Sequence, residues 1–499
     1  MSVKSFAAQI FARVVHAQTQ KWAQNPEATQ KRIFEQLIKQ ARQTVFGQDH
    51  HFEQIKTYDD FAQKVQVRDY EALRFYIDQT VSGKENITWP GKPLYYAKTS
   101  GTTSGAKYIP ISKESMPYHI QAARNAILAY VYQTGKADFV DGKMIFLQGS
   151  PSLEDKNGVQ LGRLSGIVAH YVPKYLQKNR LPSWETNCIE DWETKVDAIV
   201  DETINQDMAV ISGIPSWVQM YFERLQQKAQ KPVGEIFENF NLFIYGGVNY
   251  EPYRAKFERL IGRKVDSIEL FPASEGFFAY QDSQTEPGML LLLNSGIFYE
   301  FIKTDEFFRE NPKRYTIGEV ELGVNYVLII STNAGLWAYN IGDTVMFVCK
   351  KPYRLVVTGR IKHFISAFGE HVIGKEVETA LQQATQGTDI RITEFTVAPQ
   401  ISPENGLPYH EWLIEFENIP PNLNQLAGQL DVFMRKQNVY YDDLIAGKVL
   451  RPLVIIPVMQ NGFQQYMKSV GKLGGQNKIP RLSNDRIIAD ALIKLNADA

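Results

Sequence analysis

A run of hydroxyl-bearing residues and glycines, Thr99–Lys107, has the composition of a loop that binds phosphate. Five of its nine residues are serine or threonine, and the run ends in a lysine. Glycine lets the backbone approach an anion closely, and backbone N–H groups and hydroxyls donate hydrogen bonds to phosphate oxygens. The run is not a Walker A loop, because no Ser or Thr follows the lysine and a strand rather than a helix is expected next. A polar hairpin turn is the alternative, and the density of hydroxyls favours phosphate binding.

A second motif, Phe271–Gly276, comes at the end of an expected buried strand, Asp266–Ser274. Ligands of α/β proteins bind at the carboxyl ends of the strands. The ring of Phe271 could stack on a flat base, and Glu275 could hold Mg²⁺, which prefers carboxylate oxygen. A simple turn with a solvated glutamate explains the motif equally well when it is taken alone.

Three further motifs are weak when each is taken singly. An acidic residue follows a tight glycine turn in Tyr339–Asp343, where it could accept hydrogen bonds from sugar hydroxyls, although a hairpin turn is the simpler interpretation. Gly359–Lys362 lies where the pattern of the chain changes and is typical of a linker or hinge. Lys478 lies in a glycine-rich loop from which its ammonium could reach a phosphate, although an exposed basic turn is the simpler interpretation.

Composition excludes several other classes of protein. The 499 residues carry a net charge of −1, which predicts neither a nucleic-acid partner nor an anionic membrane partner. The two cysteines, Cys188 and Cys349, exclude a disulfide scaffold and indicate a reducing cytoplasm. The eight histidines show no zinc-ligand spacing, and the chain lacks the GxSxG, GxGxxG and kinase motifs.

The first 90 residues are expected to be mainly helical. Phe6, Ile10 and Val14 recur at four-residue intervals, which predicts that Met1–Trp22 forms an amphipathic helix. Polar residues interrupt any apolar run there, so the segment is not a signal peptide. No stretch of the chain approaches the roughly 20 apolar residues that span a bilayer.

Strand and helix patterns alternate between residues 115 and 290, which predicts an α/β domain with a largely parallel sheet. A β-rich subdomain is expected over residues 290–358. The fold class is therefore α/β, with a large N-terminal domain of mixed sheets over 1–358 and a small α+β C-terminal domain over 359–499.

Taken together and in order, these motifs resemble the GH3 family of acyl-acid amido synthetases, which belongs to the adenylate-forming superfamily. The resemblance extends over nearly the whole chain. It implies that ATP contacts Ser100, Gly101, Thr102, Thr103, Lys107, Gly247, Val248, Phe271, Ser274, Asp343 and Arg360.

The resemblance also gives these residues roles. Ser100, Thr102 and Thr103 would face the ATP phosphates, and the strand end Tyr245–Val248 would line the adenine. Phe271 stands where the family usually has tyrosine, which keeps stacking and loses a hydroxyl.

The remaining roles concern the metal, the ribose and the hinge. Ser274 and Glu275 would lie near the α-phosphate and Mg²⁺, and Asp343 would bind the ribose. Arg360 would lie at the hinge and approach the ribose, with Lys362 at the pivot. Lys478 would be the lysine of adenylation and, with Glu275, would be catalytic.

The activity that the resemblance implies is ATP- and Mg²⁺-dependent conversion of a carboxylic acid to an acyl-adenylate, followed by transfer to an amine, expected to be an amino acid. The small domain would rotate between the two steps. The partners would then be small molecules, with no nucleic acid and no membrane. Candidate acyl-pocket segments are Gly162–Tyr175 and Gly213–Phe222, by their position between the ATP motifs.

Two rival functions remain. An acyl-CoA ligase shares the first step, and it is disfavoured because no Lys or Arg precedes Gly369 in the segment Phe364–His371. A non-catalytic nucleotide-binding protein is disfavoured because Glu275, Asp343 and Lys478 are all retained.

Overall fold

The computed structural model describes residues 2–102, 105–172, 177–247, 250–304, 306–361, 364–365, 367–370, 372–470 and 479–497. The chain divides into two compact units. The first consists of Met1–Thr102, Ala106–Glu190 and Lys195–Ile361, and the second of Thr103–Gly105, Asp191–Thr194 and Lys362–Ala499. Among the described residues, no helix combines the length and apolar content needed to cross a lipid bilayer.

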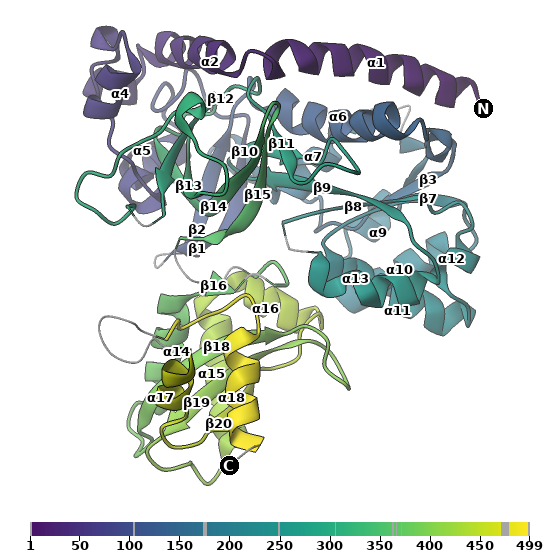
Figure 1. Cartoon of the computed structure of the whole chain (residues 1–499). Helices are drawn as coiled ribbons and strands as arrows, with labels where there is room; N and C mark the ends of the chain where they lie inside the picture. The colour runs from purple at the N-terminus through teal and green to yellow at the C-terminus, as the bar shows by residue number, and fades with distance from the viewer. Residues whose placement is uncertain are drawn as a thin grey trace. The chain divides into compact units, whose positions relative to one another are not determined.

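The first unit begins with helices, as the sequence predicts (Figure 1). They are α1 (Val3–Ala23), α2 (Pro26–Ala41), α3 (Val45–Asp49), α4 (Tyr58–Lys64) and α5 (Tyr70–Val81). Local sequence signals set where several of them begin. Pro26 starts α2, and Thr57 and Asp60 form a reciprocal capping box at the start of α4.

A small four-stranded sheet follows, in the order β2-β1-β5-β4. Its strands are β1 (Tyr95–Thr102), β2 (Gly105–Ile111), β4 (Glu154–Lys156) and β5 (Val159–Gly162). The helix α6 (Met116–Thr134) comes next in the chain after β2 and packs along α1 (Figure 1). The short helices α7 (Leu164–Ala169) and α9 (Trp184–Asn187) follow β5.

The remaining strands of this unit form one sheet of 11 strands, in the order β12-β13-β14-β15-β11-β10-β9-β8-β7-β3-β6. Its parallel half is β6 (Arg180–Leu181), β3 (Lys143–Phe146), β7 (Met208–Ser212), β8 (Leu242–Gly246) and β9 (Asp266–Ala273). The helices α10 (Trp192–Thr203), α11 (Pro215–Ala229), α12 (Val233–Ile236) and α13 (Glu251–Ile261) connect these strands. The prediction of a largely parallel α/β region is confirmed.

The antiparallel half corresponds to the β-rich subdomain. Its strands are β10 (Gly276–Tyr280), β11 (Met289–Leu291), β12 (Ile297–Lys303), β13 (Asn325–Thr332), β14 (Tyr339–Lys350) and β15 (Tyr353–Arg360). The hairpin of β9 and β10 joins it to the parallel half, so the subdomain continues the same hydrogen-bonded sheet. Strands β12 and β13 are buried on both faces, which explains the long apolar runs of the sequence.

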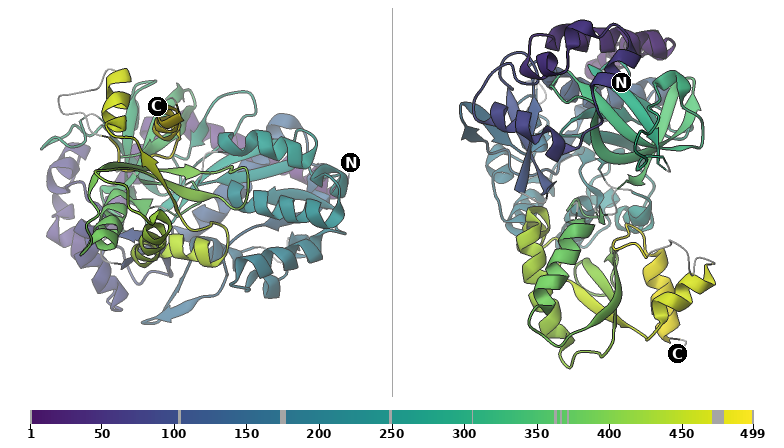
Figure 2. Two further views of the ribbon diagram at one scale, coloured as in Figure 1. Left: turned by 90° about the horizontal axis from the view of Figure 1, so that it is seen from below. Right: turned by 90° about the vertical axis from the view of Figure 1, so that its left-hand side faces the viewer.

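The second unit is built on a three-stranded sheet of β18 (Ile392–Gln400), β19 (Tyr409–Phe416) and β20 (Val454–Val458). Its helices are α14 (Gly374–Thr385), α15 (Leu423–Gln437), α16 (Val439–Ala446), α17 (Gly462–Ser469) and α18 (Ile487–Ala497). In the right-hand view of Figure 2, α14 and α15 (green) cover one face of the sheet, and α17 and α18 (yellow) cover the other. A two-stranded ladder of β16 (Phe364–Ile365) and β17 (Val372–Ile373) precedes this core.

A fully buried polar pair fixes the segment that follows the expected hinge. His410 Nε2 lies 2.8 Å from Glu370 Oε1, and both side chains are 0% exposed. The other carboxylate oxygen of Glu370 accepts a hydrogen bond from the backbone N–H of Phe368. The pair ties residues 368–370 to β19, within the second unit. His410 is thus a histidine of the core of this unit.

Candidate active site

The adjacent ends of β8 and β9 bring two of the sequence motifs together. The two strands are parallel neighbours, and Tyr245 pairs with Glu269 and Gly246 with Leu270. The glycine-rich strand end and the motif that starts at Phe271 therefore emerge at the same edge of the sheet. This is the edge at which α/β sheets hold their ligands.

Gly246 and Gly247 are glycines for different reasons. A Cβ on Gly246 would lie 2.5 Å from the carbonyl oxygen of Leu270 and 3.2 Å from Cδ of Pro272, so a side chain would separate the two strands. Gly247 has a φ of +76°, a left-handed conformation, and no atom of the described residues lies within 4 Å of its Cβ position. The first glycine allows the close approach of β8 and β9, and the second turns the chain after β8.

This difference predicts unequal effects of two substitutions. Gly246→Ala should lower the free energy of unfolding by about 2 kcal/mol, because the methyl group overlaps a backbone carbonyl that cannot move freely. Gly247→Asn adds a larger side chain and should cost less than about 1 kcal/mol, because asparagine tolerates the left-handed region. Urea unfolding of the two variants checks the order. An equal loss for both would show that the contact with Leu270 does not limit the packing of these strands.

The motif Phe271–Gly276 forms the tip of the β9–β10 hairpin. Ala273 pairs with Gly276, so Ser274 and Glu275 are the two residues of a tight turn, and both are half-buried. The ring of Phe271 is 7% exposed and packs edge-on against Phe278, with 5.1 Å between the ring centroids. Packing in the core is therefore enough to explain why an aromatic residue stands at position 271. The stacking of this ring on adenine remains a prediction.

Asp343 lies within a long strand and not in the hairpin turn that was the simpler interpretation of Tyr339–Asp343. That interpretation is wrong, because β14 runs without interruption from Tyr339 to Lys350. Gly342, with a φ of +89°, accommodates an irregular register, and its N–H donates to Asn340 Oδ1 at 2.8 Å. Asp343 is 8% exposed, and its Cα lies opposite that of Arg360 on β15. Two residues expected near the ribose are therefore cross-strand neighbours.

The expected phosphate loop is shorter than the sequence suggested. The strands β1 and β2 extend to Thr102 and from Gly105, so most of the run Thr99–Lys107 is strand. Strand conformation was not expected there, because runs rich in Gly, Ser and Thr are typical of loops. The Lys107 ammonium lies over the ring of Tyr70, 5.6 Å from its centroid. Burial raises the pKa of the Tyr70 phenol to about 12, and its oxygen accepts a hydrogen bond from the N–H of Tyr108.

Several predicted site residues lie outside the described residues, namely Thr103, Val248, Lys362 and Lys478. For Ser100, Gly101, Thr102 and Arg360 the strand backbone is described and the side chains are not. The roles of all these residues remain predictions.

The protein side chains at this site are compatible with a Mg²⁺ ion that is held mainly by the phosphates of the substrate. Among the residues that the structure describes, no group of three or more His, Cys, Asp or Glu could hold a metal ion. Mg²⁺ is usually bound through one or two carboxylates together with substrate phosphates. Glu275, half-buried at the tip of a turn beside the end of β8, fits such a single carboxylate ligand.

A buried lysine near the end of β3 was missed by the sequence analysis. Lys195 on α10 is 1% exposed, and its ammonium donates to the carbonyl oxygens of Gln148 at 3.0 Å and Asn187 at 2.6 Å. Burial lowers the pKa of Lys195 to about 8. One sequence signal was available, because Lys195 falls on the helical stripe that includes the buried Trp192 and Ile199.

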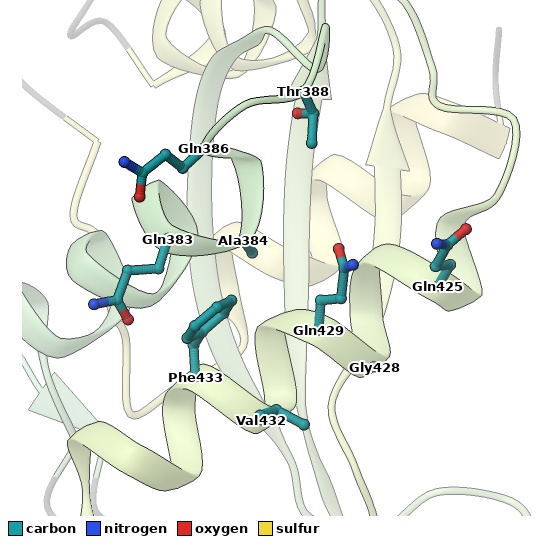
Figure 3. A pocket seen from close by; sticks show the side chains of 9 residues that line it. All are labelled: Gln383, Ala384, Gln386, Thr388, Gln425, Gly428, Gln429, Val432 and Phe433. Atoms are coloured by element: carbon teal, nitrogen blue, oxygen red, sulfur yellow. The ribbon is translucent and has the colours of Figure 1, made fainter.

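The second unit contains a groove that no sequence motif indicated (Figure 3). It lies between α14 and α15 and has a volume of about 500 Å³. Its lining is Gln383, Ala384, Gln386, Thr388, Gln425, Gly428, Gln429, Val432 and Phe433. The lining is neutral, so the groove lacks the cations expected around a nucleotide phosphate, and it contains none of the predicted site residues.

The fold is shared with solved structures of an amido synthetase and a CoA ligase. One neighbour is described as "AtGH3.15 acyl acid amido synthetase in complex with 2,4-DB", with a TM-score of 0.62 and 15% identity over 97% of this chain and 96% of the other. Another is a 2-hydroxyisobutyryl-CoA ligase in complex with 2-HIB-AMP and CoA, with a TM-score of 0.59 and 15% identity over 96% of this chain and 93% of the other. At this level of identity the likeness shows the fold.

Family models give the narrower assignment. The GH3 family N-terminal, central and C-terminal domains match residues 15–187, 290–360 and 375–487. The chain belongs to the GH3 family. It is 28% identical over 198 residues to the indole-3-acetic acid-amido synthetase GH3.3 of Arabidopsis thaliana, a match that covers 37% of this chain and 33% of that relative.

Proposed function

We propose that this protein is an adenylate-forming ligase that joins a carboxylic acid to an amine through an acyl-adenylate. Membership of the GH3 family carries the proposal. The meeting of the β8 end with the β9–β10 turn supports it, because this edge of the sheet combines the closely packed Gly246 and the left-handed Gly247 with the carboxylate of Glu275. The setting that we propose is a reducing cytoplasm, in keeping with two free cysteines.

In the first step, a carboxylate oxygen of the acid attacks the α-phosphorus of ATP in line with the departing pyrophosphate. Negative charge is then distributed over the phosphoryl oxygens. Mg²⁺, when bound by Glu275 and the phosphates, would neutralise part of that charge. The proposed part of Lys478 is to place a further positive charge on the same oxygens, and such preorganised groups often supply most of the rate enhancement.

In the second step, the amine nitrogen attacks the acyl carbon of the mixed anhydride. The bond to the phosphate oxygen breaks, AMP leaves, and the nitrogen loses a proton. We propose that the residues of 359–499 move as a domain relative to 1–358 between the two steps, with Arg360 and Lys362 at the pivot.

The decisive experiment separates the two half-reactions. A panel of carboxylic acids would be screened for ATP-dependent release of pyrophosphate, and the active acids would then be tested for release of AMP with amino acids or with CoA. Release that depends on an amino acid supports the proposal. The absence of pyrophosphate exchange across a broad panel would leave a non-catalytic nucleotide-binding protein.

An acyl-CoA ligase is the second candidate. One observation supports this second candidate. A 2-hydroxyisobutyryl-CoA ligase shares the fold over nearly the whole chain. Release of AMP with CoA and not with amino acids would decide in its favour.

The proposed ribose contact gives a prediction of its own. Asp343→Ala should raise the KM for ATP about 30-fold, because a charged hydrogen-bond acceptor is worth about 2 kcal/mol. The KM for the acid should stay nearly unchanged. Asp343→Asn keeps the shape and one acceptor, so its effect should be smaller. Equal increases in both KM values would assign Asp343 a general structural role.

A further inference from the structure

The first four turns of the long N-terminal helix α1 carry several large apolar side chains that are exposed to solvent. Val3, Phe6, Ile10 and Val14 follow one another along one side of α1 and form what we call the outer stripe. Phe6 is 57% exposed, Ile10 49% and Val14 46%. The four-residue spacing that predicted an amphipathic helix is therefore real, but this apolar face is not the one that packs against the core.

The rotation of α1 is fixed by contacts on its opposite side. Ala12 and Val15 are buried in a core cluster with residues of α6. The Ser5 hydroxyl bonds with the carbonyl oxygen of Ala137, and the Gln9 amide donates to the carbonyl oxygen of Gly135 at 2.9 Å. The packed face thus consists mainly of small and polar residues together with Val15 and Trp22, so the outward position of Phe6 and Ile10 is a consequence of specific packing.

The helix that carries the outer stripe has a positive net charge. The residues Val3–Ala23 include Lys4, Arg13 and Lys21 and contain no Asp or Glu. On the neighbouring α6, the exposed Arg124 lies over the ring of Phe11, with its guanidinium carbon 5.3 Å from the ring centroid. The net charge of −1 over the whole chain conceals this local excess, which is why composition gave no indication of it.

We propose that the outer stripe of α1 is a surface that docks reversibly on an anionic lipid bilayer. The helix α1 is about 30 Å long, and apolar side chains lie along one side of it. Together with its cationic residues, this pattern is typical of a helix that lies in the membrane interface. Charge complementarity favours anionic headgroups. A second copy of α1 would bring only positive charges together and offers no complementary pair. This inference does not depend on the proposed ligase activity.

Flotation of the full-length protein with vesicles tests the proposal. The protein should float with vesicles of phosphatidylcholine that contain about 30 mol % phosphatidylserine and not with phosphatidylcholine alone. The double variant Phe6→Gln/Ile10→Gln should reduce the bound fraction about tenfold. Raising the salt to about 0.5 M should also release the protein, because the charges are exposed and screened.

A matched control separates the outer stripe from general surface hydrophobicity. Phe75 on α5 is 69% exposed, so Phe75→Gln removes a comparable aromatic ring from another helix. Phe75→Gln should bind vesicles like the unaltered chain. All three forms should show the same thermal unfolding, because each substitution is at a largely exposed position.

Any of the following results would overturn the proposal: no flotation of the unaltered protein, equal flotation of the double variant, or a dimer in light scattering that the double variant converts to a monomer. The third result would assign the stripe to self-association. Binding to pure phosphatidylcholine as strong as to anionic vesicles would also contradict the part assigned to charge.

Discussion

Replacing Lys478 by alanine should lower the rate of acyl-adenylate formation by about 10³-fold while leaving the second half-reaction nearly intact. Removing one preorganised positive group from a developing phosphoryl charge typically costs a factor of about 10²–10³. The attack of an amine on a finished acyl-adenylate develops its charge at the acyl carbonyl. Pyrophosphate exchange measures the first step, and single-turnover amide formation from a synthetic acyl-adenylate measures the second.

Lys472 provides the matched control, because it lies six residues before Lys478 in the same glycine-rich stretch. Lys472→Ala removes the same side chain and should leave both half-reactions within about threefold of the unaltered enzyme, because the proposed charge stabilisation is assigned to Lys478 alone. Equal losses of the two half-reactions in Lys478→Ala would contradict the assigned role. A rate of exchange in Lys478→Ala like that in Lys472→Ala would dismiss Lys478 as a catalytic residue.

The second large effect is expected at the buried ion pair of Glu300 and Arg314 in the first unit. Arg314 Nε donates to Glu300 Oε1 at 2.7 Å, and the Tyr58 hydroxyl donates to the same oxygen at 2.8 Å. Glu300 is 0% exposed and the Arg314 side chain 9%. Arg314 also donates to the carbonyl oxygens of Ala62 and Val65, so the pair connects β12 with the end of α4.

Glu300→Ala should lower the free energy of unfolding of this unit by about 4 kcal/mol. The substitution leaves the Arg314 charge buried without its carboxylate, and breaking such a pair costs about 3–5 kcal/mol. Burial is the main cause that raises the pKa of Tyr58, and this cause does not depend on Glu300, so the phenol stays protonated in the variant and cannot replace the lost negative charge. Urea unfolding followed by tryptophan fluorescence measures the loss.

Two further variants test whether the burial of the ion pair causes the loss of stability. Glu321→Ala removes an exposed partner of Lys303 on the same strand β12 and should cost less than about 1 kcal/mol. The double variant Glu300→Ala/Arg314→Met removes both charges and should be more stable than Glu300→Ala alone, because no charge remains buried. If Glu300→Ala and Glu321→Ala cost the same, the buried pair contributes nothing beyond an ordinary surface contact.

Much of the local structure could be predicted from the residues because each element follows a local rule. The apolar runs at Met208–Gly213 and Asn241–Gly247 are strands, and the helical periodicity at Trp217–Gln230 is a helix. Motifs whose residues follow directly on a buried strand, such as Phe271–Glu275, were also found at the expected sheet edge. Short polar motifs were harder to interpret. The glycine of Tyr339–Asp343 marks an irregularity inside β14, and a left-handed glycine can serve a turn or a bulge equally well.

The sequence by itself indicated candidate residues for the chemistry, predicted where most helices and strands lie, and showed which family the chain resembles. Only the tertiary structure decided that Gly246 lies against Leu270, that Asp343 and Arg360 are paired in the register of the adjacent strands β14 and β15, and that Lys195 is buried. It also decided that Phe6 and Ile10 face outward. The physical reason is that periodicity establishes that a helix has an apolar face, whereas the packing of distant segments decides which face becomes buried.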